Sequence, residues 1–186
     1  MALRIEGKRL YLRTLAKKDA KDIANLVNEK LIGRWTSVPH PYNLKMAYDF
    51  IKKTQQGIRK GTGYELGMFL KGEDKFIGMC SLTSVKKDIN QAEAGYWIGK
   101  PYRKKGYTYE ATKLVVDYGF RKLKLFRIEI CHAPGNKGSE RIIKKLGFKF
   151  EGIARKALIT GIGERKDKVW YSILRTEFDK VRKKWR

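Results

Sequence analysis

The fold is decided by the stretch Gly95-Tyr96-Trp97-Ile98-Gly99-Lys100-Pro101-Tyr102-Arg103-Lys104-Lys105-Gly106-Tyr107-Thr108-Tyr109-Glu110-Ala111. Its pattern predicts a strand, then a basic turn, then a helix. The first turn of a helix has backbone N–H groups without internal partners, and the helix dipole adds partial positive charge there. A diphosphate fits such a place, Gly106 allows close backbone approach, and the three preceding basic residues add full charges. A merely solvated basic loop is the structural alternative.

On either side of this stretch, apolar periodicity predicts further strands and helices. We expect strands at residues 8–14, 64–70, 76–84, 93–98, 126–131, 149–154 and 168–174. We expect helices at 17–30, around Met46 to Ile51, at 107–122, at 137–146 and at the C-terminal end, with Gly57, Gly61 and Gly63 marking a loop. This order predicts an α+β (mixed α/β) fold, in which helices flank a mostly antiparallel sheet that contains one β-α-β crossover.

The length of 186 residues is enough for one domain with a hydrophobic core, and no linker or repeat divides the chain. The apolar runs are too short to cross a bilayer, and residues 1–6 lack the apolar segment of a secretory signal. Cys80 and Cys131 do not have metal-type spacing. We therefore expect a single domain over residues 1–186 in a reducing cytoplasm, without a metal site or membrane association.

The charge is strongly asymmetric, because 43 Lys and Arg residues stand against 19 Asp and Glu, for a formal net charge of +24. Such an excess attracts polyanions, chiefly nucleic acid. The basic residues are spread along the chain, and only residues 180–186 form a dense cluster. Contact with RNA or the ribosome and a Lys-rich surface of a heat-stable protein both remain open.

Two motifs carry a resemblance to a known family. Residues 103–108 resemble the R/Q-x-x-G-x-G/A signature of the GNAT superfamily of N-acetyltransferases, with Thr108 in the place of the last Gly or Ala. Asn136-Lys137-Gly138-Ser139, followed by Lys145-Leu146-Gly147-Phe148, resembles the second motif of that family. The opening residues 8–13 and the pair Pro41-Tyr42 resemble its RimJ/RimL-like branch, which acetylates ribosomal-protein N-termini and some small amines.

The resemblance implies acetyl-CoA, or its product coenzyme A, as the cofactor. In this family the central strand, here residues 93–98, splays from the next strand and pairs with pantetheine and the thioester carbonyl. The residues that the resemblance assigns to cofactor binding are Tyr96, Trp97, Ile98, Arg103, Lys104, Lys105, Gly106, Tyr107, Thr108, Asn136 and Ser139.

The same resemblance suggests the catalytic groups. Many members donate a proton to the leaving thiolate from a Tyr seven residues after the motif Asn, but Ile143 stands there, so Ser139 becomes the candidate. A Ser at a helix start is also a common cap. Glu93 is the candidate general base, acting through water, although an exposed strand Glu needs no function. Cys131 is more simply a structural cysteine than an acyl carrier.

The acceptor is less well defined. Trp35, Tyr42 and Tyr171 are expected to wall the acceptor pocket by resemblance, although aromatic residues are more often core. We expect direct attack by a primary amine, most simply a protein N-terminal α-amine of ribosomal-protein type. The alternatives are a small amine or antibiotic acceptor, a polyamine, which the scarcity of acidic residues disfavours, or an inactive fold that binds RNA or the ribosome. Monomer and homodimer both remain possible.

Overall fold

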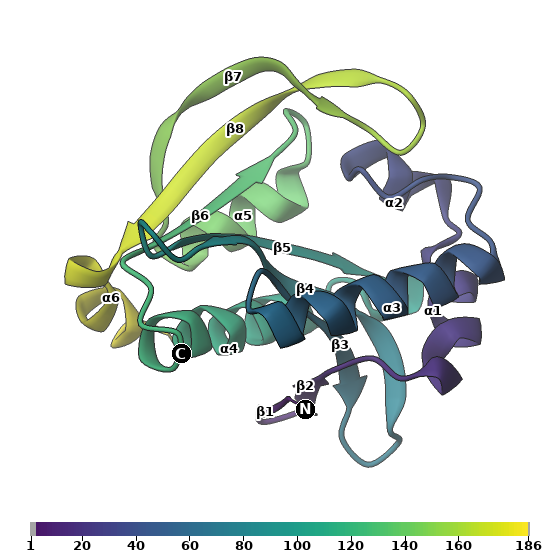
Figure 1. The fold of residues 1–186 in the computed structure, drawn as a ribbon. Coiled ribbons are helices and arrows are strands. Elements are labelled where there is room, and N and C mark those ends of the chain that lie inside the picture. The colour runs from purple at the N-terminus through teal and green to yellow at the C-terminus, as the bar shows by residue number, and fades with distance from the viewer. Residues whose placement is uncertain (1–2, 186) are drawn as a thin grey trace.

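A computed structural model describes residues 3–185, so that Met1, Ala2 and Arg186, the ends of the expected domain and of its basic tail, lie outside it. The described chain forms one eight-stranded sheet with helices on both faces (Figure 1). The spatial order of the strands is β1-β2-β3-β4-β5-β6-β8-β7, and every neighbouring pair is antiparallel except β5 and β6. This is the expected mixed α/β architecture.

The elements follow the predicted order with four additions. The strands are β1 (Arg4–Glu6), β2 (Leu10–Arg13), β3 (Tyr64–Leu70), β4 (Lys75–Lys86), β5 (Gln91–Ile98), β6 (Arg127–His132), β7 (Lys149–Ile159) and β8 (Arg165–Leu174). The helices are α1 (Ala20–Val27), α2 (Lys30–Trp35), α3 (Leu44–Lys60), α4 (Tyr107–Arg121), α5 (Lys137–Lys145) and α6 (Arg175–Arg182), with short 3-10 turns at Lys17–Asp19 and Lys100–Tyr102. The additions are β1, α2 and the two short turns.

Strands β5 and β6 are paired over only part of their length. Their parallel register runs from Gln91 opposite Arg127 to Ala94 opposite Ile130 and then stops. Beyond this point β5 continues on β4, with Trp97 opposite Met79, while β6 continues on β8. The two strands therefore diverge, and from Gly95 onward the backbone groups of β5 that point away from β4 have no neighbouring strand.

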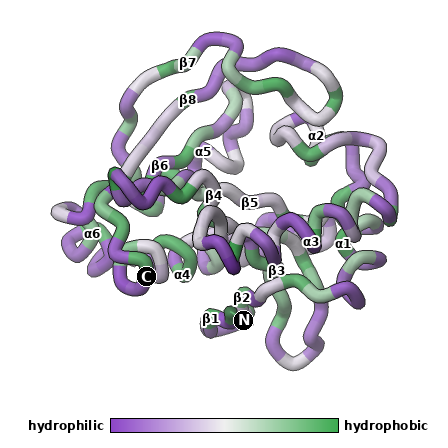
Figure 2. Tube along the Cα trace, viewed as in Figure 1, coloured by the Kyte–Doolittle hydropathy of each residue, from purple (hydrophilic) through white to green (hydrophobic). Residues whose placement is uncertain are grey.

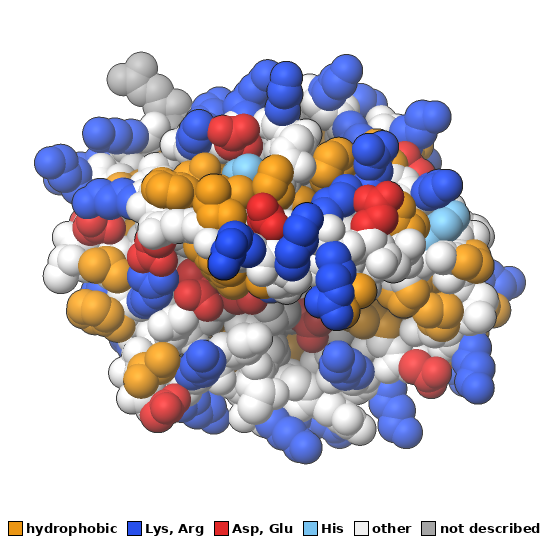
Figure 3. All heavy atoms as spheres, turned by 90° about the horizontal axis from the view of Figure 1, so that it is seen from above, with side chains coloured by type: hydrophobic (Ala, Val, Ile, Leu, Met, Phe, Trp, Pro, Cys, Tyr) orange, Lys and Arg blue, Asp and Glu red, His pale blue; other side chains and the backbone are white. Residues whose placement is uncertain are grey.

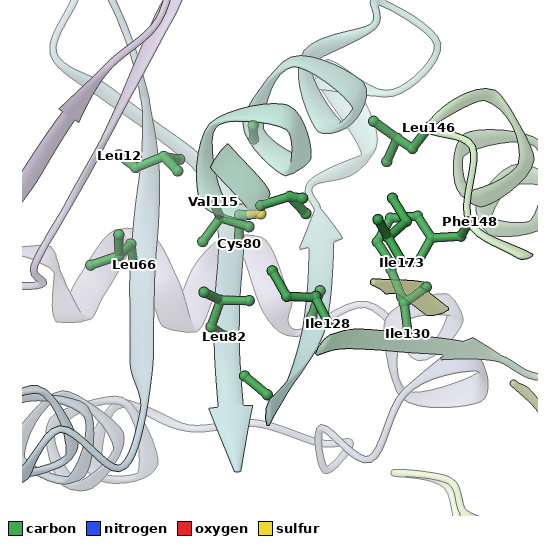
Figure 4. Close-up of a cluster of buried hydrophobic side chains, with 14 of the residues drawn as sticks. Leu12, Leu66, Cys80, Leu82, Val115, Ile128, Ile130, Leu146, Phe148 and Ile173 are labelled. Atoms are coloured by element: carbon green, nitrogen blue, oxygen red, sulfur yellow. The ribbon is translucent and has the colours of Figure 1, made fainter. Parts of the chain in front are cut away.

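The two faces of the sheet bury different clusters. On one face, α4 packs against β4 and β5, and its Val115 and Phe120 are fully buried among strand residues such as Leu82 and Ile128. Figure 4 shows side chains of β3, β4 and β6 gathered around Val115. On the other face, α1 and α3 cover a second cluster that includes Ile51 and Phe76. Burial on both faces explains why the central strands are almost continuously apolar.

Helix α3 is longer than its sequence indicates. Asn43 caps its start by accepting a hydrogen bond from the Met46 amide at 2.9 Å, and its buried face carries Ala47 and Ile51. Figure 2 shows the resulting alternation of hydrophilic and hydrophobic segments along α3. The prediction that Gly57 lies in a loop is wrong, because the helix continues to Lys60 and ends at Gly61, whose φ of +68° only a glycine adopts easily.

The hairpin of β7 and β8 is longer than predicted. Its strands extend by five residues beyond 154 and by three before 168, and register shifts interrupt β7 between Phe150 and Gly152 and between Ala154 and Leu158. These irregularities break the alternation of apolar and polar residues on which the sequence prediction depended. Figure 1 shows the hairpin arching over β6 toward α2. No helix within residues 3–185 is long and apolar enough to span a bilayer.

An ion pair joins the last three strands. Arg127 of β6 makes two hydrogen bonds to the Glu151 carboxylate of β7, and the Ser172 hydroxyl of β8 donates to the same carboxylate at 2.6 Å. The hydrogen bonds from Arg127 lower the pKa of Glu151 to about 2. The group is partly exposed, so solvent screening limits its value to on the order of 1 kcal/mol.

We predict that this stabilisation is present above the ordinary pKa of a Glu and is lost as the pH falls toward 2, because the folded-state pKa is the lower one. Urea unfolding should show the Glu151→Gln variant to be less stable than the unaltered protein by about 1 kcal/mol near pH 7. The difference should shrink at about pH 3. An equal difference at both pH values would contradict this assignment.

Candidate active site

A cleft of about 660 Å³ opens where β5 and β6 diverge. Residues from α1, α2, α3, the loop that follows α2, strands β3 to β8 and the start of α5 line it. Among the predicted site residues, the cleft brings together Trp35, Tyr42, Glu93, Tyr96, Trp97, Asn136 and Ser139. The cleft therefore brings the central strand at 93–97 together with the start of the second motif, Asn136 and Ser139.

One wall of the cleft holds two hydroxyl groups in contact. The Tyr96 hydroxyl lies 2.9 Å from Ser139 Oγ and 3.4 Å from the Ser139 carbonyl oxygen, to which it can donate. Asn136 caps α5 by accepting a hydrogen bond from the Ser139 amide at 3.2 Å. The cap of this helix is therefore Asn136 and not Ser139, so the Ser139 hydroxyl is available for other chemistry.

Burial raises the pKa of Tyr96 above its ordinary value, although the hydrogen bond with Ser139 opposes the shift. The phenol is therefore fully protonated at neutral pH and is a stable proton donor. Sequence reasoning assigned Tyr96 to cofactor binding but did not identify the role of its hydroxyl. Residues of a strand alternate between faces, so Tyr96 and Glu93 point to opposite sides of β5. The sequence predicts this alternation, but it does not predict that the Tyr96 hydroxyl meets Ser139 of α5.

The other wall is acidic. Asp49 of α3, Glu65 of β3 and Glu93 of β5 line the cleft together with Lys53 and Lys168. Within residues 3–185, these three carboxylates take no part in the salt bridges of the molecule. Figure 3 shows acidic side chains inside the hollow of this face and Lys and Arg side chains around it.

This wall corrects an expectation from composition. Acidic residues are scarce in the chain as a whole, but three come together here from elements far apart in the sequence. Burial raises the pKa of Glu65, and the nearby Lys53 opposes that shift. A carboxylate of raised pKa beside a cleft is a candidate proton acceptor, so Glu65 joins Glu93 in that role.

Cys131 lies beside Glu93 but is not activated. Its Sγ donates to Glu93 Oε1 at 3.6 Å, and burial together with the Glu93 charge raises the thiol pKa to about 12. The neighbouring His132 is buried in the cleft wall, with its Nδ1 3.0 Å from the Ala133 carbonyl oxygen. A thiol of this pKa is a poor nucleophile, because only the thiolate attacks.

The basic loop before α4 lies beyond the cleft, at the far end of β5. Neither Ile98 nor residues 103–108 line the cleft. Gly106 caps α4 with φ +78°, and within the described chain the amides from Lys104 to Tyr109 meet no protein acceptor. Arg103 is not free, because its guanidinium binds both oxygens of Glu29 at 2.6 and 2.9 Å. It therefore braces the loop against the start of α2, while Lys104 and Lys105 are exposed.

The tip of the β7–β8 hairpin contacts the segment from Gly33 to His40 at one side of the cleft. The Gly161 amide donates to the Gly33 and Thr36 carbonyls, both at 2.8 Å, and the His40 amide donates to the Gly161 carbonyl at 3.0 Å. A side chain at Gly161 would put its Cβ 1.6 Å from the Val38 carbonyl oxygen, so this approach requires glycine. The contact joins the hairpin tip to the segment from Gly33 to His40, next to Trp35 and Tyr42, which line the cleft.

Tyr171, unlike Trp35 and Tyr42, does not line the cleft. It is only 5% exposed, and its ring stacks on His132 with centroids 5.6 Å apart and meets Phe150 edge-on. Tyr171 supports the wall from behind rather than lining the cleft, because its ring is enclosed by the core on α4 and α5. No group of His, Cys, Asp and Glu within residues 3–185 has the arrangement of a metal site.

The sequence matches the family described as the acetyltransferase (GNAT) domain over residues 9–149. The chain belongs to this family. The match spans the loop at 103–108, the divergent strands and the Tyr96–Ser139 pair. The protein is accordingly a GNAT N-acetyltransferase.

Relatives of this GNAT protein agree on the activity. It is 36% identical over 166 residues to the probable N-acetyltransferase YjcK of Bacillus subtilis, covering 86% of this chain and 92% of the relative. It is 27% identical to the ribosomal protein uS5-alanine N-acetyltransferase of Escherichia coli, with 84% of each chain covered. A solved structure of a probable acetyltransferase superposes with a TM-score of 0.85 at 30% identity, covering 94% of this chain and 98% of that one.

We predict that both thiols of this GNAT protein are unreactive, because burial raises the pKa of Cys80 and of Cys131 to about 12. Iodoacetamide at about pH 8 should label the folded protein at least a hundredfold more slowly than a small free thiol. Mass spectrometry measures the labelling, and the protein in urea provides the control in which both thiols react. Rapid labelling of Cys131 in the folded protein would contradict the assignment.

Proposed function

We propose that this GNAT protein transfers the acetyl group of acetyl-CoA to the N-terminal α-amine of a protein, by direct attack of the amine on the thioester. The observation that carries the proposal is the arrangement around β5. Proton donors, Tyr96 and Ser139, stand on one side of the strand, and the carboxylate of Glu93 stands on the other. Acyl transfer to an amine needs both, because one proton leaves nitrogen and one must reach sulfur.

The residues present fit coenzyme A. The amides from Lys104 to Tyr109 stand at a helix start and have no protein acceptor among residues 3–185, which suits a diphosphate. The edge of β5 beyond Ala94 has lost its neighbour at β6, so the backbone groups that point to this edge are available to the amide groups of pantetheine, except the Ile98 carbonyl, which accepts a hydrogen bond from Arg103 Nε at 3.3 Å. Strand β5 thus leads from the loop at residues 103–108, called the diphosphate loop below, to the cleft.

The chemistry needs no enzyme nucleophile. The amine nitrogen forms a bond to the thioester carbon, and the carbon–sulfur bond then breaks. Glu93, through water, takes the proton released by nitrogen. Ser139, hydrogen-bonded to Tyr96, donates to the departing sulfur. The pKa of Tyr96 is raised, so its hydroxyl stays protonated over a wide pH range. The hydrogen-bonded pair of Tyr96 and Ser139 can therefore act as a proton donor over that range.

The acceptor side of the cleft suits an ammonium group before it loses its proton. The carboxylates of Asp49, Glu65 and Glu93 attract it, and the aromatic rings of Trp35, Tyr42 and Trp97 line the same cleft. An α-amine has a pKa of about 7.7–8.0, so it needs only modest help to deprotonate at neutral pH. The relative named for acetylating the alanine of a ribosomal protein supports a protein N-terminus as the acceptor.

The same carboxylates favour a second candidate, a polyamine or another small cationic amine. Asp49, Glu65 and Glu93 outnumber the lysines of the cleft by three to two, and the formal charge of the whole chain is +24. An aliphatic amine has a pKa of about 10.4, so it demands a stronger base than an α-amine does. That demand makes the α-amine the better acceptor at neutral pH.

We predict that Ser139→Ala and Tyr96→Phe each lower kcat by about a hundredfold or more while the Kd of acetyl-CoA changes little. The double variant should be hardly slower than the slower single variant, because the two hydroxyls act as one donor. Steady-state kinetics and calorimetry measure the two quantities. Tyr118→Phe, a Tyr of α4 outside the cleft, serves as the control. Unchanged turnover in Ser139→Ala would remove Ser139 from the mechanism.

We predict that a panel of acceptors at about pH 7.5 ranks peptides with a free N-terminal Ala or Ser first, polyamines next and N-terminally blocked peptides last. Release of free thiol measures transfer. The peptide rate should rise with pH through the pKa of its own amine, at about 8. Preference for polyamines would select the second candidate. Salt-sensitive RNA binding without any acetyl transfer would instead indicate an inactive, RNA-associated fold.

A further inference from the structure

Arg9, the residue before strand β2, contacts the diphosphate loop. Arg9 stands in the turn between β1 and β2, beside the start of α4. Its Nη1 donates to the Lys105 carbonyl oxygen at 2.8 Å, and its Nε donates to Glu110 Oε2 at 2.8 Å. The backbone amide of Arg9 also donates to Glu110 Oε1 at 2.7 Å, and its guanidinium lies 4.7 Å from the centre of the Tyr107 ring.

These contacts fix a carbonyl inside the loop. In a trans peptide unit, the C=O of one residue and the N–H of the next point in opposite directions. Because Arg9 holds the Lys105 carbonyl on its own side, the Gly106 amide must point away from Arg9. Within the described residues this amide meets no acceptor. Arg9 therefore sets the direction of a donor at the place where a diphosphate would bind.

The carboxylate of Glu110 explains why Arg9 stays in place. It is only 12% exposed in its side chain, and although burial opposes the change, hydrogen bonds from the Arg9 amide and guanidinium hold the pKa of Glu110 below its ordinary value. The guanidinium of Arg9 donates to Glu110 and to Lys105 from two separate nitrogens, Nε and Nη1, whereas an ammonium group offers only one nitrogen for both acceptors. Arg103 braces the start of the same loop through Glu29, so the loop is held at two points.

We propose that Arg9 is a positioning residue for coenzyme A, and that it presents the Gly106 amide to the diphosphate by holding the Lys105 carbonyl. This inference rests on the proposed function, because it concerns the same cofactor. It assigns a role in cofactor binding to the turn before β2, far in sequence from the loop that it serves.

Calorimetric titration of Arg9→Ala with coenzyme A should give a Kd about tenfold higher than that of the unaltered protein. The same loss is expected with 3′-dephospho-coenzyme A, which keeps the diphosphate. With acetyl-pantetheine, which lacks it, kcat/KM should be unchanged. Arg9→Lys should fall between the two proteins, since it keeps the charge and the stem but loses the fork.

Arg4→Ala is the matched control. It removes one arginine from the same N-terminal hairpin, where Arg4 contacts Glu6 and Tyr11 and no residue of the loop, so it tests the loss of charge alone. Equal Kd values in the unaltered protein, Arg9→Ala and Arg9→Lys would overturn the inference. So would a loss confined to ligands with the 3′-phosphate, or an equal loss of kcat/KM with acetyl-pantetheine. Failure of the unaltered protein to bind coenzyme A would remove the proposed function itself.

Discussion

Strands β5 and β6 part after Ala94 and Ile130, and the positions of the site residues depend on that divergence. A parallel pair that remained hydrogen-bonded to its end would leave no room between Tyr96 and His132 and no free edge on β5. The unpaired edge costs free energy unless water or a ligand supplies the missing hydrogen bonds. The rest of the sheet compensates, because β4 and β8 hold the outer sides of the two diverging strands. The candidate site thus lies at a local interruption of strand pairing in the middle of the sheet.

The divergence also separates two electrostatic environments within one cleft. On the α5 side, a buried phenol and a serine hydroxyl are neutral donors. On the α3 side, carboxylates without ion-pair partners among the described residues create a negative field inside a strongly positive protein. A field of opposite sign within a low-dielectric cleft is felt more strongly there than at the surface. The molecule therefore combines a net positive charge with a cleft wall that carries three carboxylates.

The sequence predicts much of the fold and part of the candidate site. The features that it does not predict have identifiable physical causes. Strand β3 has the predicted bounds, and the motif around Gly106 marks the strand–turn–helix unit correctly, because local periodicity and turn chemistry determine both. The acidic wall was missed because Asp49, Glu65 and Glu93 belong to three elements that only the tertiary fold joins. Helix α2 was missed because six residues are too few for a periodic pattern, and it is held by the hairpin tip instead of by its own propensity.

The hairpin tip also bears on how the protein can be handled. Exposed loop tips are normally where added peptide is tolerated, because few contacts cross them. The turn at Gly161 is different, since its amide and carbonyl are bound to backbone between Gly33 and His40, and the closest approach leaves no space for a single methyl group. An epitope or fluorophore placed there would open the side of the cleft. The hairpin of β3 and β4 is the better attachment point, because a Cβ added at Gly72 in its turn would meet no other atom within 4 Å.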